Sequence, residues 1–384
     1  MSRPQVLIVG GGMITQDQIL PSLSYLQRQR RIGEISVCAL SFSTIRDLAR
    51  AFPDQPFRSW PDADGPPQPE LFRQAIAALP PRQIVVVAVP DQLHYEFVMA
   101  ALAHEQHVLC VKPLALEHAH AAAIDRAARA RGLLVAIEYH KRFDDRSLMA
   151  RRKYRAGEFG EFRLGSARLF EKWYYRHSNF QNWMTVENSD AFTYIGCHYV
   201  DLVHFITGLL PTAVSVYGVR DRFPNGNEGF LWTDARVIWN NGACLNVQNG
   251  LGFPDAAPGT NTQGMVLYCA TGDTGGLIEH SDQYRGLKYS YMNNSYAEPS
   301  PDYFQYIDLA DGALTPVGYG YRSIEHIISA AMHVEADPGH LDAIDRAGII
   351  ATPRNSAYNE RVIEAGRESI LNGGRMVEIH DDAD

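Results

Sequence analysis

Three consecutive glycines follow a short apolar run near the start of the 384-residue chain, and they constrain its fold more than any other stretch. The run Val6–Val9 is aliphatic without alternation, which is typical of a buried parallel strand, and a helix-like segment follows the glycines. Glycines at such a turn let the backbone approach a pyrophosphate at a helix N-terminus. The spacing G-x-G-x-x-T ends in Thr15, where the dinucleotide fingerprint has Gly or Ala. The stretch favours a dinucleotide site at Gly10, Gly12, Met13 and Ile14; a glycine-rich turn of another α/β protein is the alternative.

Length, charge and cysteine content set the broad class of protein. The length allows two domains of about 100–200 residues each. The net charge of −9 argues against nucleic acid or an anionic membrane surface as a partner, and no apolar run has the length of a membrane span. The N-terminus leads directly into the first strand, and the five cysteines form no C-x-x-C pair. We therefore expect a cytoplasmic protein with reduced thiols and no metal site.

Short apolar strands alternate with helical patterns as far as residue 143. The predicted strands after the glycine turn are 35–40, 84–89, 107–110 and 133–139. This alternation indicates βαβ units and a parallel sheet, a Rossmann-type α/β domain over residues 1–143. Ligands of such sheets bind at the carboxyl ends of the strands. Four candidate residues fall at those ends: Gly10, Ser41, Pro90 and Lys112.

From residue 144 the pattern changes to strands separated by Gly, Asn and Pro turns. The predicted strands are 163–170, 212–219, 231–239, 243–249, 264–270 and 277–280, with helices at 191–206, 321–334 and 355–371. This predicts an α+β domain over residues 144–384 with a large, mostly antiparallel open sheet. Whether the last helix packs back on the first domain stays open. A sheet face covered by few helices leaves apolar area to bury, so we expect a homodimer or homotetramer.

The end of the second predicted strand bears on the choice of dinucleotide. NAD-binding folds usually place an acid there, which accepts hydrogen bonds from the ribose 2′-hydroxyl. Here no acid precedes Asp47, and the stretch offers Ser41, Ser43 and Arg46. These groups suit a 2′-phosphate, which slightly favours NADP over NAD. The alternative is an NAD ribose held by serine and backbone groups.

Lys112 follows a strand end and precedes Pro113. Proline pushes the preceding residue toward an extended conformation, which gives the lysine a defined direction. A partly desolvated ammonium can hydrogen-bond a substrate oxygen and stabilise an alkoxide. The alternative is a solvated surface lysine.

Four polar residues share one face of the predicted helix 191–206 and its start: Asp190, Tyr194, His198 and Asp201. Gly196 inside the helix suggests that another group passes close to its backbone. A histidine can take a hydroxyl proton near neutral pH. The alternative is that His198 is an ordinary core or interface residue. A metal site formed by His198, Asp201 and His204 has little support, because these three side chains do not share one face of the helix.

Several short motifs occur in an order that resembles the Gfo/Idh/MocA oxidoreductases over nearly the whole chain. They are Pro90-Asp91-Gln92-Leu93-His94, Lys112-Pro113, Lys141-Arg142-Phe143-Asp144, Gly196-Cys197-His198-Tyr199-Val200-Asp201 and Glu368-Ser369-Ile370, besides the glycine turn. The resemblance implies an NAD(P)-binding first domain, with Pro90, Asp91, His94 and Lys112 at the cofactor. It also implies a substrate site that includes Lys112, Arg142, Asp190, Tyr194 and His198.

By the same resemblance Lys112 and His198 are the catalytic pair. His198 would take a sugar hydroxyl proton while hydride leaves the same carbon for nicotinamide, and Lys112 would hold the oxygen. Two positions depart from the family pattern: Tyr194 stands where an acid is common, and Val111 replaces a glutamate. A phenol cannot supply the negative charge that stabilises an imidazolium, which leaves Asp190 or Asp201 to compensate. Trp173, in an aromatic and basic cluster over residues 172–177, is a candidate substrate wall or interface residue, and the loops 172–188 and 222–229 are expected to set substrate identity.

These features together predict an NAD(P)-dependent oxidoreductase that acts on a hydroxyl of a sugar, polyol or sugar derivative. Two alternatives remain open. One is an enzyme that cleaves a glycoside or eliminates a group through transient oxidation on a retained NAD. The other is a non-catalytic regulator that senses a dinucleotide or sugar, which the tyrosine at position 194 keeps open.

Overall fold

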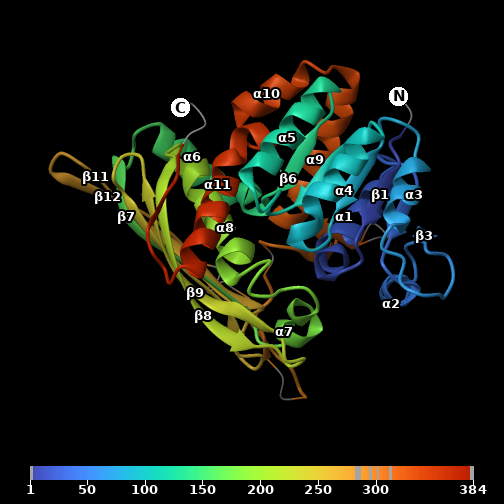
Figure 1. Ribbon diagram of the computed structural model, residues 1–384, viewed down its shortest axis with the longest axis horizontal. Coiled ribbons are helices and arrows are strands. Elements are labelled where there is room, and N and C mark those ends of the chain that lie inside the picture. The colour runs from blue at the N-terminus through green and yellow to red at the C-terminus, as the bar shows by residue number, and fades with distance from the viewer. Residues whose placement is uncertain (1–2, 282–286, 294–295, 301, 311–313, 381–384) are drawn as a thin grey trace. The chain divides into compact units, whose positions relative to one another are not determined.

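The computed structural model describes residues 3–380 except 282–286, 294–295, 301 and 311–313. The chain forms two compact units (Figure 1). The first unit comprises residues 1–140 and 303–357, and the second comprises residues 141–302 and 358–384. The first crossing lies near the predicted boundary at residue 143, whereas the return of 303–357 to the first unit differs from the predicted division. Helical periodicity does not encode the partner of a helix, which is why this return is not visible in the sequence.

The first unit is built on a six-stranded parallel sheet of order β3-β2-β1-β4-β5-β6. The strands are β1 (Val6–Val9), β2 (Ile35–Cys38), β3 (Arg58–Trp60), β4 (Ile84–Val87), β5 (His107–Val111) and β6 (Val135–Glu138). All five pairings are parallel, as predicted. Sequence analysis missed β3, a three-residue edge strand whose side chains are only partly buried. Such a strand is too short to show a period.

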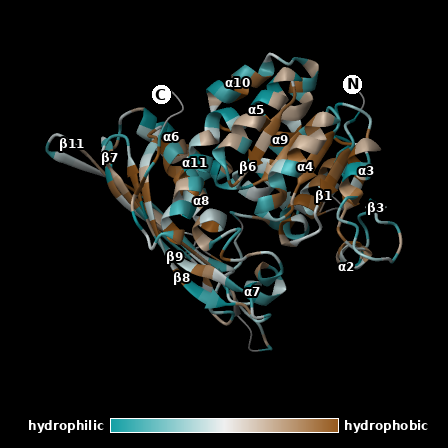
Figure 2. Ribbon diagram, viewed as in Figure 1, coloured by the Kyte–Doolittle hydropathy of each residue, from teal (hydrophilic) through white to brown (hydrophobic). Residues whose placement is uncertain are grey.

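Helices cover this sheet. They are α1 (Leu20–Arg28), α2 (Phe42–Ala51), α3 (Leu71–Ala77), α4 (His94–Ala103), α5 (His118–Ala130), α9 (Tyr319–Ala336) and α10 (His340–Ala347). Hydrophobic residues follow β1 and its neighbours, while hydrophilic residues line the visible sides of α5 and α10 (Figure 2). The returning segment begins with a hairpin of β15 (Gln305–Asp308) and β16 (Leu314–Val317). Arg31, just after α1, then binds both Glu325 and Ser329 of α9, which fixes the returning helix against α1.

The helix after the glycine turn begins in π-helical form. Residues Thr15–Ile19 (η1) have π geometry, and α1 continues from Leu20. Pro21 lies in the first turn of α1, where its missing N–H costs little. The change of helix type therefore falls directly before Pro21. π-Helical turns often occur at functional sites, and this one directly follows the glycine turn.

The second unit contains a seven-stranded sheet of order β12-β11-β7-β10-β9-β8-β17. Its strands are β7 (Glu161–Lys172), β8 (Pro211–Arg222), β9 (Glu228–Trp239), β10 (Cys244–Phe253), β11 (Asn261–Thr271), β12 (Thr274–Ser281) and β17 (Val377–Glu378). The pairings are antiparallel except β7 with β10, so the prediction of a mostly antiparallel sheet is confirmed. A short pair, β13 (Tyr289–Ser290) with β14 (Tyr296–Ala297), stands apart from this sheet.

The remaining helices of the second unit are α6 (Asp145–Arg155), α7 (Tyr175–Ser178) and α8 (Cys197–Thr207), with the short turns η3 (His140–Phe143), η4 (Phe180–Asn182) and η5 (Phe192–Gly196). Helix α11 (Pro353–Leu371) begins in the first unit and ends in the second. The predicted helix 191–206 is present as η5 and α8, and it ends at Gly208 with a left-handed φ of 81°. A Cβ on Gly196 would lie 2.6 Å from Phe192 Cδ2 and 2.7 Å from Asn249 Oδ1. These two residues are the close neighbours that a glycine inside the helix suggested.

The buried His107 at the start of β5 makes the first unit sensitive to acid. Its Nδ1 accepts a hydrogen bond of 3.0 Å from the Leu134 N–H, so this nitrogen carries no proton in the folded state. Burial lowers the pKa of His107 to about 4, against a hydrogen bond with Glu335 that raises it. Because the folded pKa lies below the ordinary 6.5, the unfolded chain binds the proton first as the pH falls.

We expect the free energy of unfolding to fall by about 3 kcal/mol between pH 6.5 and 4 through this one histidine. In the His107→Asn variant the amide oxygen can replace Nδ1 as acceptor, so this contribution should disappear. Urea unfolding followed by fluorescence across that pH range measures it. The exposed His104→Asn variant is the control, and equal slopes for wild type and His107→Asn would contradict the assignment.

Candidate active site

The glycine turn is held in a conformation that only glycine adopts easily. Gly10 has a φ of 108°, and a Cβ there would lie 2.0 Å from the Ala88 carbonyl oxygen. The Gly10 N–H donates to the Cys38 carbonyl at 2.8 Å, and the Thr15 hydroxyl donates to the Gly10 carbonyl at 2.7 Å. Thr15, which departs from the dinucleotide fingerprint, therefore closes the turn by a hydrogen bond.

The next part of the turn is open. Gly12 is exposed, and a Cβ placed on it would meet no atom within 4 Å. Met13 and Ile14 are half-buried and begin the helical segment that continues as η1. An exposed backbone at a helix N-terminus is suited to a phosphate group. These residues thus fit the pyrophosphate of a dinucleotide.

The residues proposed to choose between NAD and NADP lie together after β2. The Ser41 and Ser43 hydroxyl oxygens are 2.8 Å apart, and α2 begins at Phe42. Arg46 lies one turn into α2, and its Nη1 is 3.6 Å from the Asp64 carboxylate. Both members of this pair are exposed. Sequence analysis missed Asp64, because it is distant along the chain and only the fold brings it to Arg46.

His94 lies at the start of α4, after the end of β4. Its ring is fully buried, with Nδ1 2.6 Å from the Pro113 carbonyl and Nε2 2.8 Å from the Val89 carbonyl. The ring therefore ties the segment after β4 to the segment after β5. Both nitrogens face the backbone, so the ring is a clamp between two strand ends, and its contact with the cofactor stays a prediction. Pro90 and the buried Asp91 lie within the same clamped segment.

Lys112 directly follows β5 and precedes the clamped Pro113. Its side chain is 9% exposed, which excludes the alternative of a solvated surface lysine. The adjacent Val111 pairs with Glu138 at the end of β6. A largely desolvated ammonium at the carboxyl edge of a parallel sheet can bind an oxygen that develops negative charge.

In the second unit, Asp201 and Arg142 bind one another. Arg142 donates from Nε at 2.8 Å and from Nη2 at 2.6 Å to the two carboxylate oxygens of Asp201, and both side chains are buried. The Tyr358 hydroxyl donates to Asp201 at 2.8 Å and accepts from Arg142 at 3.2 Å. Burial, followed by the Asp201 charge, raises the pKa of Tyr358 well above its ordinary value. The three side chains thus join η3, α8 and α11, while the catalytic role of Asp201 and the substrate role of Arg142 stay predictions.

Asp190 likewise binds residues of the second unit. Its carboxylate accepts from the Thr193 N–H at 2.8 Å and hydroxyl at 2.9 Å, and from Arg367 Nη1 at 3.0 Å. The residue thus joins the first turn of η5 to α11, and its substrate role stays a prediction. The π geometry of η5 also changes the predicted shared face, because that face assumed 3.6 residues per turn throughout.

Tyr194 and His198 follow on the same helical segment. The Tyr194 ring meets the Phe180 ring edge-on, with centroids 4.9 Å apart, and lies 5.6 Å from the Trp183 ring. His198 lies in the first turn of α8 and is mostly buried. Trp173 is 46% exposed, and one face of its ring stacks on the Arg176 guanidinium at 3.7 Å. Trp173 thus has an accessible face for either a ligand or a protein.

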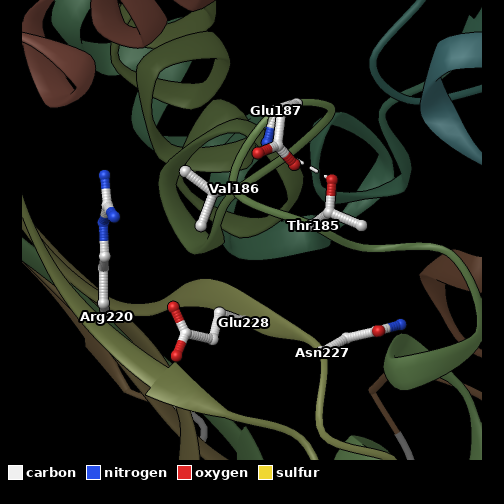
Figure 3. A pocket seen from close by; sticks show the side chains of 6 residues that line it. All are labelled: Thr185, Val186, Glu187, Arg220, Asn227 and Glu228. Atoms are coloured by element: carbon white, nitrogen blue, oxygen red, sulfur yellow. Dashed lines mark hydrogen bonds between the residues drawn. The ribbon is translucent and has the colours of Figure 1, made fainter.

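An open pocket of the second unit lies between the two loops expected to set substrate identity (Figure 3). It is lined by Thr185, Val186, Glu187, Arg220, Asn227 and Glu228. The loops are joined by a hydrogen bond of 3.1 Å from the Val186 N–H to the Glu228 carbonyl. A hydrogen bond from the Thr185 hydroxyl lowers the pKa of Glu187. Carboxylate, amide and guanidinium groups of this kind can bind hydroxyls, but no sequence rule singled out these residues.

Within the described part of the chain, no group of three or more His, Cys, Asp or Glu side chains is placed to hold a metal ion. None of the helices in those residues is both long enough and apolar enough to cross a membrane.

Comparison with known families agrees with this geometry. Residues 5–139 match an oxidoreductase family with an NAD-binding Rossmann fold, and residues 147–272 match the Gfo/Idh/MocA C-terminal domain. The chain belongs to the Gfo/Idh/MocA oxidoreductase family. Its first unit is therefore an NAD-binding Rossmann domain, and the resemblance seen in the sequence motifs is confirmed.

Individual relatives are distant. D-glucoside 3-dehydrogenase of Escherichia coli is 27% identical over 217 residues, 55% of this chain and 56% of that protein. The 2,7-anhydro-N-acetylneuraminate hydratase of the same organism is 27% identical over 134 residues, 35% of this chain and 36% of that protein. The matches thus span about half or less of these relatives. The crystal structure of GenD2 from gentamicin A biosynthesis, in complex with NAD, has the same fold, with a TM-score of 0.69, 19% identity and coverage of 99% of this chain and 97% of that one.

The two glycines of the turn provide a matched pair of variants. We expect Gly10→Ala to reduce the free energy of unfolding by at least about 2 kcal/mol, because a Cβ would strain the backbone and meet the Ala88 carbonyl. Gly12→Ala should leave stability within about 0.5 kcal/mol but weaken dinucleotide binding, since its Cβ projects into the open side of the turn. Urea unfolding and fluorescence titration with dinucleotide measure the two effects. Equal behaviour of the variants in both assays would contradict this division of roles.

Proposed function

We propose that the protein is an NAD(P)-dependent oxidoreductase that transfers hydride between a hydroxyl carbon of a sugar, polyol or sugar derivative and nicotinamide. The observation that carries the proposal is the buried Lys112, at the carboxyl end of β5 in an NAD-binding Rossmann domain. The His94 clamp supports it, because it holds the backbone on both sides of this edge.

The chain's own residues have distinct tasks in this proposal. Gly10, Gly12, Met13 and Ile14 hold the pyrophosphate, and the bound dinucleotide supplies the hydride acceptor. Lys112 binds the substrate oxygen and stabilises the charge that develops on it. His198, by its position in the family pattern, is the second polar group offered to the substrate, while Tyr194 and Trp173 are candidates for its wall.

The dinucleotide is either NADP or NAD, with NADP slightly favoured. Ser41, Ser43 and Arg46 support NADP, because a guanidinium and hydroxyls suit a 2′-phosphate. The Asp64 carboxylate near Arg46 weakens that preference, since it competes for the same guanidinium. Parallel titrations with NADP+ and NAD+ distinguish the two.

A second reaction class on the same scaffold is supported by the hydratase among the relatives. An enzyme of this kind oxidises its substrate transiently, cleaves or eliminates a group, and returns the hydride to the product. It shows no net reduction of added dinucleotide, whereas a dehydrogenase does. The non-catalytic regulator remains a third reading, which dinucleotide binding without turnover of any sugar would favour.

We also propose that the protein is a homodimer or homotetramer formed through the outer face of the second unit's sheet. Leu277, Tyr268 and Leu164 are aligned across β12, β11 and β7 and are about half exposed. Exposed Asp234 and Arg236 follow on β9. A row of apolar side chains beside both signs of charge can pair with its own copy, and light scattering in solution tests this.

The Lys112→Met variant tests the proposed function most directly. We expect its kcat/KM to fall at least about 10²-fold, the order found when a group that stabilises developing charge is removed. Dinucleotide affinity should change little. The Lys153→Met variant, in which a half-exposed lysine paired with Glu158 is replaced, is the control. Reduction of dinucleotide by a panel of sugars and polyols is the assay, and unchanged kinetics in Lys112→Met would remove Lys112 from the mechanism.

A further inference from the structure

The acid that usually binds the ribose of NAD is absent from the end of β2, but another acid of the first unit lies beside Arg46. The Asp64 carboxylate is 3.6 Å from Arg46 Nη1. Arg46 belongs to α2, whereas Asp64 lies in the loop 61–70 between β3 and α3. The following βα unit thus brings a carboxylate to the helix that begins where this acid is usually found.

Two backbone hydrogen bonds hold this loop against the end of β2. At the start of the loop, the Ala39 N–H donates to the Trp60 carbonyl at 2.9 Å. Near its end, the Gln68 N–H donates to the Leu40 carbonyl at 2.9 Å. The stretch between these two bonds therefore leaves and returns beside the same strand end. Asp64 lies midway along it, close to the serines that are proposed to bind the dinucleotide.

Arg46 and these serines belong to the first two turns of α2 and the residue before it. Ser43 and Arg46 are three residues apart, which places their side chains on one side of the helix. The Ser43 hydroxyl oxygen lies 2.8 Å from that of Ser41. The acid that follows Arg46 in the sequence, Asp47, pairs instead with an arginine one turn further along α2, at 3.8 Å. Among the described ion pairs, Arg46 takes part only in the one with Asp64.

The ion pair is weak enough for a ligand to compete with it. The Arg46 side chain is 43% exposed and that of Asp64 is 73% exposed, and ion pairs between exposed side chains contribute little to stability. Either side chain can therefore turn to a ligand at small cost. A guanidinium suits the 2′-phosphate of NADP, and a carboxylate accepts a hydrogen bond from the ribose 2′-hydroxyl of NAD. The pair thus contains the group that is typical of each dinucleotide class.

We propose that Asp64 is the acid that binds the NAD ribose in this protein, and that the Arg46–Asp64 pair lets the site accept both dinucleotides. This rests on the proposed oxidoreductase function. In the NAD complex, Asp64 accepts a hydrogen bond from the 2′-hydroxyl and stays paired with Arg46. In the NADP complex, Arg46 leaves Asp64 and binds the 2′-phosphate together with Ser41 and Ser43. The two affinities then lie within about tenfold of one another, because each dinucleotide gains one charged partner.

Calorimetric titration of the full chain with NAD+ and with 2′-deoxy-NAD+ tests the assigned hydrogen bond without any turnover. Wild type should bind NAD+ at least about threefold more tightly than the deoxy compound, because only NAD+ offers the hydroxyl. Asp64→Ala removes the acceptor, so it should bind the two compounds equally within about twofold. The exposed Asp62→Ala, in the same loop, is the control and should keep the wild-type difference. A wild-type difference that persists in Asp64→Ala would overturn the proposal.

The same titrations with NAD+ and NADP+ test the pair as the determinant of selectivity. Asp64→Ala should bind NADP+ at least about threefold more tightly than wild type, because no carboxylate then competes for Arg46. Arg46→Gln should bind NADP+ at least about tenfold more weakly, and NAD+ within about threefold of wild type. An NAD+ to NADP+ affinity ratio that is unchanged in both variants would overturn the inference alone. A wild-type protein that binds neither dinucleotide would overturn the proposed function, and the inference with it.

Discussion

A charged side chain removed from water costs several kcal/mol unless partners surround it, and this constraint organises both units of the protein. In the second unit it joins Arg142 to Asp201, and it holds Asp190 against Arg367. In the first unit it gathers three donors around Glu138. Each of these contacts ties together elements that are distant in sequence. A buried charged side chain whose partners lie within the protein thus stabilises the fold and is less able to bind a ligand.

At the candidate site, the same constraint distinguishes residues that hold the backbone in place from those that can bind a substrate. His94 has both ring nitrogens on backbone carbonyls and holds two strand ends in place. Lys112 is carried on one of these ends, and its burial makes its charge effective toward an oxygen. Gly10 performs a related task at β1, where its backbone conformation allows the Ala88 carbonyl to come close. A rigid edge of this kind positions reacting groups at no cost during the reaction.

Sequence analysis recovered the parts of this design that depend on local pattern. The parallel sheet, the antiparallel sheet, the glycine turn and the helix over 191–206 all follow from short-range periods and turn residues. It could not assign the partner of a charged residue, because Asp201 and Tyr358 are 157 positions apart. The pairing of Asp201 with Arg142 is likewise visible only in the folded chain. The contacts of Glu138 with Gln18, Ser323 and His140 were not predicted, because Gln18 and Ser323 are distant from it in the sequence and only the folded chain brings them together.

The return of residues 303–357 to the first unit has a consequence for the order in which the protein matures during synthesis. The six strands of the parallel sheet have all been made by residue 138, yet Tyr303, Ser323 and the helices α9 and α10 emerge after most of the second unit. Until then Glu138 lacks the Ser323 hydroxyl, and Gln18 lacks the Tyr303 hydroxyl. The dinucleotide domain begins first on the ribosome but is completed only after most of the second unit has been made. A nascent chain that ends near residue 300 would carry all six strands of the parallel sheet, but Glu138 would still lack the Ser323 hydroxyl.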